Sequence, residues 1–271
     1  MLQGYSIPRT PAGRSSLAPQ PPWHYTGEVL AVEFAADAQA VAAYLPPGLS
    51  PASGARAGRC AIYFCEWQFA TDGGLEYLDP LTSQYRETIL LMACERDGAS
   101  ASFCPYIWVD QDLALMRGLI QGWPKQFGRT GMTRSYGMRS PAAPSLSEGG
   151  RFGAALTFRD RRVVEAQIAL QGQSHRLPDP GFASTFNVRH FPRLTAGRHD
   201  DPAVHELVQL RARDVAIENP MIGQASLTLF EHPGLELGAF TPISVGEGFR
   251  MSVSLTVDDL QLAQDYTSNA R

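Results

Sequence analysis

The sequence predicts an α+β protein, with a mainly antiparallel β-sheet closed into a barrel and helices on its periphery. Three observations predict this class. Many short segments are rich in apolar, aromatic and β-branched residues, few segments show helical signals, and an Asp97-Gly98 turn joins two strand-like segments as a hairpin. The chain has 271 residues, of which 44% are hydrophobic and 18% charged, so it can bury a sizeable core.

We expect an arm followed by a single domain. Residues 1–22 are rich in Pro, Ser and Gly and lack the apolar stretch of a signal peptide, which predicts an extended N-terminal arm. Residues 23–271 show no repeat and no low-complexity tract, which predicts one domain. No apolar run reaches the roughly 18 residues of a membrane span, so we expect a cytoplasmic protein. The net charge of −4 implies no basic face, so nucleic acid is not an expected partner.

The first part of the domain combines strands with one short helix. Asp37 can cap a helix over residues 38–44, and Pro46 and Pro47 stop it. Apolar and aromatic runs suit buried strands, and the two runs that flank the Asp-Gly turn form the hairpin. These strands are expected at residues 28–34, 61–69, 87–95 and 100–109.

A second helix is predicted over residues 112–121. Apolar residues recur along it at helical spacing, and Asp110 can cap its first turn. Gly122 fits the left-handed position that ends a helix, and Pro124 prevents continuation. Lys125 should therefore sit on a rigid turn just past the helix end, where its side chain can be aimed inward.

The remainder of the chain is rich in strand signals. A tight link at Arg159-Asp160-Arg161 separates the first two segments, and residues 140–150 form a surface loop. The expected strands cover residues 152–158, 162–170, 184–191, 207–217, 225–230 and 249–257.

Metal and cofactor motifs are absent from the sequence. It contains no G-x-G-x-x-G, P-loop, G-x-S-x-G or H-E-x-x-H pattern. The four cysteines form no C-x-x-C pair, and none of the six histidines is spaced as a metal ligand with a second candidate. We therefore expect reduced, buried thiols, and neither a metal nor a cofactor.

The lysine content is unusual. Of the 23 lysines and arginines, 22 are arginines and only Lys125 is a lysine. Arginine replaces lysine in most surface and ion-pair roles, but its guanidinium stays protonated and cannot act as an amine nucleophile. A composition that excludes lysine everywhere else favours a chemical role for this amine. The alternative is an ordinary surface lysine on a turn.

Two segments carry a family resemblance. The run Q-G-W-P-K-Q-F-G at residues 121–128 resembles the active-site motif of the acetoacetate decarboxylase superfamily, in which an aromatic residue and Pro precede a Schiff-base lysine. Upstream, Tyr85-Arg86-Glu87 resembles the segment that carries a family glutamate. The resemblance extends weakly over residues 21–266. It implies the barrel fold, a homo-oligomer, and Schiff-base chemistry at Lys125 on a small carbonyl substrate.

The resemblance also assigns roles to individual residues. A neutral amine must attack the carbonyl, so the lysine pKa has to fall from about 10.4 by burial or through a nearby cation; acetoacetate decarboxylase is itself a known example of the cationic case. Each of these residues also has an interpretation without a functional role. Glu87 and Glu66 would lie at a solvated strand edge, Gln121 would be a polar residue at a helix end, and Trp123 and Tyr266 would only pack. The expected catalytic residues are Lys125, Glu87 and Tyr266, and the expected substrate-binding residues are Gln121, Trp123 and Glu66.

The sequence departs from the decarboxylase pattern at charged positions. Gln126 replaces a second lysine, Gly118-Leu119 replaces an Arg-Glu pair, and Gly27 aligns with a first-strand arginine. Gln121 instead offers a donor and an acceptor four residues before the lysine. In these respects the chain resembles the aldolase-dehydratases of the superfamily, which join pyruvate to an aldehyde through the same lysine.

The leading interpretation is a carbon–carbon lyase, an aldolase-dehydratase that condenses pyruvate or a related 2-oxo acid with an aldehyde. Three alternatives stay open: a decarboxylase of acetoacetate or another β-keto acid, an oxo-acid cyclase of a natural-product pathway, and a non-catalytic barrel that binds a small ligand. The expected partners are therefore a small oxo acid and an aldehyde.

Overall fold

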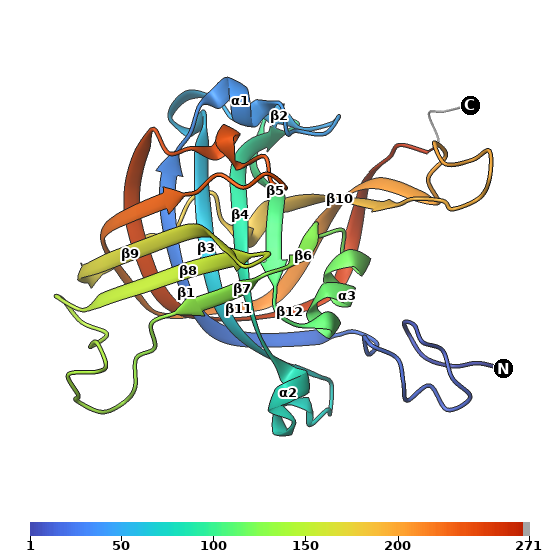
Figure 1. The fold of residues 1–271 in the computed structure, drawn as a ribbon, viewed down its shortest axis with the longest axis horizontal. Helices are drawn as coiled ribbons and strands as arrows, with labels where there is room; N and C mark the ends of the chain where they lie inside the picture. The colour runs from blue at the N-terminus through green and yellow to red at the C-terminus, as the bar shows by residue number, and fades with distance from the viewer. Residues whose placement is uncertain (268–271) are drawn as a thin grey trace.

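The computed structural model describes residues 1–267, and within them twelve strands join one sheet (Figure 1). The strands are β1 (Trp23–Ala35), β2 (Ser50–Pro51), β3 (Arg59–Thr71), β4 (Gln84–Arg96), β5 (Ala99–Val109), β6 (Lys125–Phe127), β7 (Arg129–Met132), β8 (Arg151–Phe158), β9 (Arg161–Gln173), β10 (Thr185–Phe191), β11 (Val204–Leu229) and β12 (Ser244–Asp265). The helices are α1 (Ala38–Ala42), α2 (Pro80–Ser83) and α3 (Asp112–Ile120). Short 3₁₀ turns lie at Gly54–Arg56, Glu76–Leu78, Phe182–Ser184 and Leu237–Phe240.

The sheet is predominantly antiparallel, as the sequence predicted. Its strand order is β10-β5-β4-β3-β1-β12-β11-β9-β8-β7, with β2 paired to β4 and β6 paired to β5. Only the β10–β5 and β5–β6 pairs are parallel. Strand β10 also pairs with β11. The three helices lie at the periphery of the sheet (Figure 1).

Two tight turns follow the expected chemistry. Asp97 and Gly98, between β4 and β5, have φ values of 52° and 77°. Arg159 and Asp160, between β8 and β9, have φ values of 45° and 62°. Two successive residues with positive φ match the right-handed twist of the flanking strands, which is why such turns connect hairpins.

One strand prediction was wrong. Residues 207–217 and 225–230 were expected as separate strands but belong to one strand, β11. Its pairing with β12 shifts register at several points, and Asp214 and Asn219 have positive φ values of 52° and 50°. Such bulges bend a strand without ending it. The polar residues that interrupt the apolar pattern therefore mark bends rather than a loop.

The start of α3 also differs from its prediction. Gln111, not Asp110, occupies the N-cap position, and it makes no side-chain cap hydrogen bond. The Asp110 carboxylate instead accepts a hydrogen bond from the Arg86 amide on β4 at 2.7 Å. The end of the helix is as predicted, because Gly122 has a φ of 81°. After it, Lys125 opens β6 and lies opposite Ile107 of β5, so its backbone is held by the sheet rather than by a turn.

The two faces of the sheet carry separate apolar clusters. Leu30 and Val32 of β1 belong to one cluster, whereas Val29 and Ala31 belong to the other. This alternation follows from the two-residue period of a strand. The second cluster includes Trp123, Ile107 of β5 and Val253 of β12. The four cysteines are buried and free, and within residues 1–267 no helix is long and apolar enough to span a membrane.

Helix α3 packs closely against Lys125 because Gly118 has no side chain. A Cβ atom on Gly118 would lie 2.2 Å from Lys125 Cδ and 2.5 Å from its Cε. Real atoms do not approach this closely, so the lysine methylenes occupy the volume that a larger residue would need. The Gly118 position therefore fixes the path of the lysine side chain.

We expect Gly118→Ala to lower the free energy of unfolding by about 1–3 kcal/mol, the usual cost of overpacking a tight core. A loss of stability would be informative, because helix propensity alone would favour alanine by about 1 kcal/mol. Urea denaturation measures the change. Gly131→Ala on β7 is the matched control, since nothing lies within 4 Å of its added methyl. Equal midpoints for Gly118→Ala and the wild type would show that the lysine can move aside freely.

Candidate active site

A cavity of about 510 Å³ opens on the face of the sheet that carries Trp123. Its walls come from β1, β3, β4, β5, β6, β11 and β12 and from the loop of residues 177–184. Lys125 lines this cavity, and only 7% of its side chain is exposed. The lysine amine is therefore accessible to a small molecule but largely shielded from bulk water.

Lys125 is paired with Glu87. The Lys125 Nζ lies 3.0 Å from Glu87 Oε2, and the glutamate side chain is also only 7% exposed. The pairing follows from the strand order, because Glu87 lies on β4, Lys125 on β6, and β5 runs between them. A carboxylate in this position can accept a proton from the amine or from a substrate bound to it.

Trp67 fixes the orientation of the Glu87 carboxylate. Its indole Nε1 donates a hydrogen bond to Glu87 Oε1 at 2.8 Å, which leaves the other oxygen for Lys125. The Trp67 ring sits against Gly27, where an added Cβ would lie 2.6 Å from Trp67 Cε3 and 2.2 Å from the Glu66 carbonyl oxygen. The first-strand position that carries an arginine in the resembling decarboxylases therefore has no room for any side chain here.

Burial lowers the pKa of Lys125 from its ordinary value of 10.5. The neighbouring Glu87 carboxylate opposes this by stabilising the ammonium form, and the Arg117 guanidinium adds to the lowering. Of the two causes that the sequence left open, burial is the larger. A nearby cation is present as well, although the position after the lysine is a glutamine.

Arg117 is the residue that the sequence analysis missed. It is 1% exposed, and its guanidinium carbon lies 3.6 Å from the centre of the Phe69 ring. Tyr25 and Tyr85 flank it at 5.4 and 5.5 Å. Neither terminal nitrogen has a hydrogen-bond partner among the described residues. The available signal was a lone arginine in the otherwise apolar helix directly before Gly118.

Gln121 lies at the end of α3 and is 6% exposed. Its Nε2 donates to the Arg117 carbonyl oxygen at 3.1 Å. Burial raises the pKa of Tyr25, and a hydrogen bond with the Gln121 side chain acts in the opposite direction. Gln121 therefore connects α3 to Tyr25 at the lysine end of the cavity, which it lines together with Trp123.

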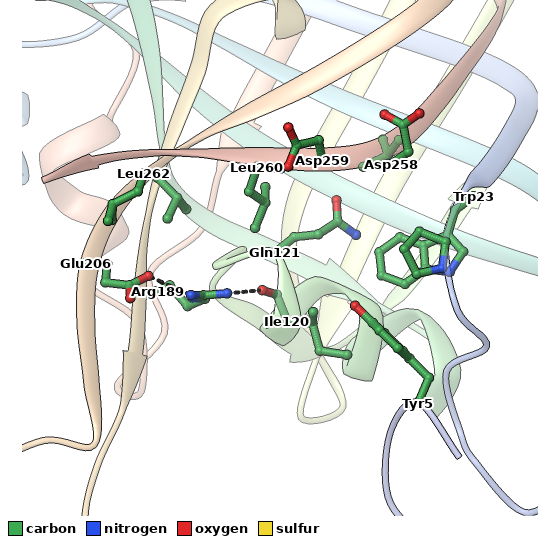
Figure 2. A pocket seen from close by; sticks show the side chains of 13 residues that line it. Tyr5, Trp23, Ile120, Gln121, Arg189, Glu206, Asp258, Asp259, Leu260 and Leu262 are labelled. Atoms are coloured by element: carbon green, nitrogen blue, oxygen red, sulfur yellow. Dashed lines mark hydrogen bonds and ion pairs between the residues drawn. The ribbon is translucent and has the colours of Figure 1, made fainter. Parts of the chain in front are cut away.

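Gln121 also lines a second, outer pocket of about 320 Å³ (Figure 2). This pocket lies between α3, β10, β11, β12 and the N-terminal segment, where Tyr5 packs edge-on against Trp23. Arg189 lines this pocket and forms an ion pair with Glu206 at 2.7 Å. Among residues 1–267, Gln121 and Val257 alone line both this pocket and the lysine cavity, so they form the wall between the two.

Glu66 and Tyr266 do not line the lysine cavity. Glu66 follows the alternation of β3: because Trp67 faces the lysine, Glu66 faces the other side, where Arg86 and Arg134 bind its carboxylate at 2.9 and 3.2 Å. The Tyr266 hydroxyl donates to the Pro47 carbonyl oxygen at 2.6 Å. Of the other five expected residues, the structure brings Glu87, Gln121 and Trp123 to the cavity with Lys125 and leaves Glu66 and Tyr266 elsewhere.

No group of three or more histidine, cysteine, aspartate or glutamate residues is arranged to hold a metal ion within residues 1–267. Around Lys125, the cavity presents an amine, a carboxylate, aromatic rings and an amide. An amine that loses its proton by burial, beside a fixed carboxylate, can add to a carbonyl carbon and move protons on the adduct.

Known proteins resemble this chain along nearly its whole length. Residues 6–267 match the family model of acetoacetate decarboxylase (ADC). The enduracididine biosynthesis enzyme MppR, complexed with the condensation product of pyruvate and imidazole 4-carboxaldehyde, has 36% sequence identity and a TM-score of 0.91, covering 98% of each chain. MppR complexed with pyruvate has 35% identity and a TM-score of 0.90, covering 98% of this chain and 99% of that one. A search of the curated proteins finds no match.

A more distant structure shares the fold. Acetoacetate decarboxylase from Legionella pneumophila has 16% identity and a TM-score of 0.72, covering 98% of this chain and 97% of its own. The family model covers nearly the whole chain, and MppR matches it end to end at 36% identity. On this evidence the chain belongs to the acetoacetate decarboxylase family.

Proposed function

We propose that this chain is a Schiff-base aldolase-dehydratase that condenses pyruvate or a related 2-oxo acid with an aldehyde through Lys125. The observation that carries the proposal is the buried Lys125–Glu87 pair at 3.0 Å, held by Trp67 inside a cavity of about 510 Å³. The MppR relatives support it, because one is complexed with pyruvate and another with a condensation product of pyruvate and an aldehyde.

The chemistry divides into steps that the residues can perform. The neutral Lys125 amine adds to the keto carbon of the oxo acid, and the adduct takes up one proton and loses water, which leaves an iminium. Glu87 removes a proton from the adjacent methyl group. The resulting enamine attacks the aldehyde carbon, and the protonated Glu87 returns the proton to the aldehyde oxygen. Loss of water from the aldol adduct gives a conjugated imine, and a second water releases the unsaturated oxo acid and restores the amine.

Arg117 and Gln121 favour binding of the substrate carboxylate at the lysine end of the cavity. The unpaired Arg117 guanidinium keeps the lysine end of the cavity electropositive, which favours an anionic oxo acid. The Gln121 amide lines the same end and can hydrogen-bond the carboxylate. Neither Tyr266 nor Glu66 is placed beside this end of the cavity, so we assign neither a role in this mechanism.

The proposed site depends on closure of the sheet around it. Strand β10 pairs with β5 on one side and β11 on the other, so the hydrogen-bonded path from β5 through β12 to β11 returns to its start. We infer that the strands form a closed barrel, with the lysine cavity inside it.

Decarboxylation of a β-keto acid is the second candidate, because the family model that matches the chain is that of acetoacetate decarboxylase. It would use the same imine but expel carbon dioxide in place of a proton. Carbon dioxide release from acetoacetate, without product formation from pyruvate and aldehydes, would favour this reaction over the aldol.

We expect Lys125→Arg to abolish covalent trapping of pyruvate by borohydride, because guanidinium cannot form the imine. Intact mass of the reduced protein measures the adduct. Arg129→Lys, which places a new amine at an exposed position of β7, is introduced into Lys125→Arg as the control. Trapping should not return in the double variant, since a solvated amine stays protonated at neutral pH. An adduct of undiminished amount in Lys125→Arg would rule out the assigned nucleophile.

Glu87→Gln should separate imine formation from turnover. Loss of a general base typically slows a reaction by about 10²–10⁴-fold, so the near-ultraviolet absorbance of product should rise far more slowly. Trapping with borohydride should persist, because the Glu87 carboxylate raises the pKa of Lys125 and its removal leaves more neutral amine. Parallel loss of both signals would mean that Glu87 only orients the lysine.

Arg117→Met should raise the pKa of Lys125, since the guanidinium is one of the effects that lower it. A higher pKa leaves less neutral amine at pH 7, so trapping of pyruvate slows and its pH profile moves to higher pH. Added salt should leave the wild-type profile in place, because charges buried this deeply are screened little. Arg134→Met, at a half-exposed arginine that binds Glu66, is the matched control and should leave the profile unmoved.

A further inference from the structure

We propose that the second substrate is a neutral aldehyde with an extended apolar tail, such as an aryl or arylvinyl group, and that the tail lies in the part of the cavity remote from Lys125. This inference rests on the proposed function and specifies its aldehyde. It is carried by the shape of the cavity, by the apolar walls of its far part, and by the internal hydrogen bonds of the polar groups there.

The cavity extends along β5. Ile107 lies opposite Lys125 in the sheet, and Ala101, six residues earlier on the same strand, also lines the cavity. Six residues of strand span about 20 Å, which is much longer than a three-carbon oxo acid. A substrate attached to Lys125 therefore fills only one end and leaves the rest for the aldehyde.

The walls between the two ends are apolar. Strand β12 presents alternate residues to the cavity, so one side chain in every two along this stretch faces it. Strand β11 contributes Leu210 and Ile217, and β4 contributes Ile89. The four β12 residues are Met251, Val253, Leu255 and Val257.

The charged pair at the far end is already satisfied. Arg56 donates from Nε and Nη2 to the Asp179 carboxylate at 2.9 and 2.7 Å, and Nη2 also lies 3.3 Å from the Ala101 carbonyl oxygen. The arginine and aspartate side chains therefore neutralise each other. A charged aldehyde would have to displace one of them.

Three neutral polar groups of the far end are occupied in the same way. The Tyr63 hydroxyl donates to the Pro180 carbonyl oxygen at 2.6 Å. The Ser102 hydroxyl donates to the Gly181 carbonyl oxygen at 2.9 Å, and the Ser184 hydroxyl accepts from Gln209 at 3.0 Å. An incoming polar tail would lose its water without gaining an equivalent partner, which is unfavourable.

The rim of this end is apolar as well. Leu177 is 48% exposed and Val215 is 57% exposed, and both line the cavity. Phe182 lies beside them in the same loop as Pro178 and packs against Tyr63 at 4.5 Å between ring centres. An aryl tail that enters here would contact apolar side chains from the rim to the walls.

A matched pair of aldehydes tests the proposal. With pyruvate saturating, kcat/KM is measured for cinnamaldehyde and for 4-carboxycinnamaldehyde, which differs by one ionised carboxylate. The neutral aldehyde should be favoured by about tenfold or more, since the Arg56–Asp179 pair and the bonded hydroxyls of the far part would not replace the hydration that the carboxylate loses. Equal values, or a preference for the anion, would overturn the inference.

A rim variant tests where the tail lies. Val215→Asp places a carboxylate at the apolar rim and should lower kcat/KM for cinnamaldehyde by about fivefold or more, because the tail would lie against a charge. Val245→Asp is the control, since Val245 is an exposed valine of β12 that does not line the cavity. Identical kinetics for the two variants would refute the placement of the tail.

Trapping of pyruvate with borohydride, run on the same preparations, separates the two hypotheses. If pyruvate is trapped normally but the aldehyde preference is reversed, the inference fails and the proposed function stands.

If pyruvate is not trapped, the proposed function fails. The cavity is then tested with unreactive cinnamyl alcohol and 4-carboxycinnamyl alcohol through the fluorescence of Trp67 and Trp123, which both line it. Tighter binding of the neutral alcohol supports apolar specificity, and tighter binding of the anion overturns it.

Discussion

The burial of one amine beside one carboxylate sets the requirements for the rest of the site. Lys125 and Glu87 are both removed from water, and a buried ion pair recovers its lost hydration only where geometry and extra hydrogen bonds are good. Trp67 supplies such a bond to the carboxylate, and Gly118 leaves the volume through which the lysine side chain passes. The same burial lowers the pKa of the amine, so the cost in solvation also favours the neutral form that the proposed reaction requires.

The charged positions that differ from the decarboxylase pattern are connected in space. Gly27 carries no side chain, and the Trp67 ring that holds Glu87 lies against it. Gly118 carries none either, and the lysine occupies its place. The positive charge lost at these positions is supplied by Arg117, which stacks on Phe69 and lowers the pKa of Lys125. These substitutions rearrange the charges around the lysine rather than simply removing them.

The cavity has two chemically different ends because different strands and loops build them. At one end, the meeting of β4, β5, β6 and α3 gathers an amine, a carboxylate and an amide. At the other end, β5, β11, β12 and residues 177–184 supply apolar walls and polar groups that are bonded to one another. A site of this kind can hold a small anionic group and a larger apolar group at the same time.

Local sequence was sufficient for the features that depend on neighbours in the chain. The Asp97-Gly98 hairpin and the helix end at Gly122 were predicted because positive φ is a property of these residues themselves. The lone lysine in its Trp-Pro-Lys motif singled out Lys125, and the motif upstream singled out Glu87, which the structure pairs with that lysine at 3.0 Å. Gln121 and Trp123 lie at the predicted cavity because they are a few residues from that lysine.

Tertiary structure decided what depends on pairing between distant segments. Sequence alternation shows that Glu66 and Trp67 face opposite sides of β3, but only the packed sheet shows which side holds the lysine. Tyr266 lies far along the chain, and its hydroxyl binds Pro47 through a contact that no local pattern encodes. Arg117 resembled an ordinary helix arginine until Phe69, Tyr25 and Tyr85 were seen to enclose it. The sequence by itself selected Lys125 as the candidate nucleophile, because only one lysine is present, whereas long-range packing decided which side chains surround it.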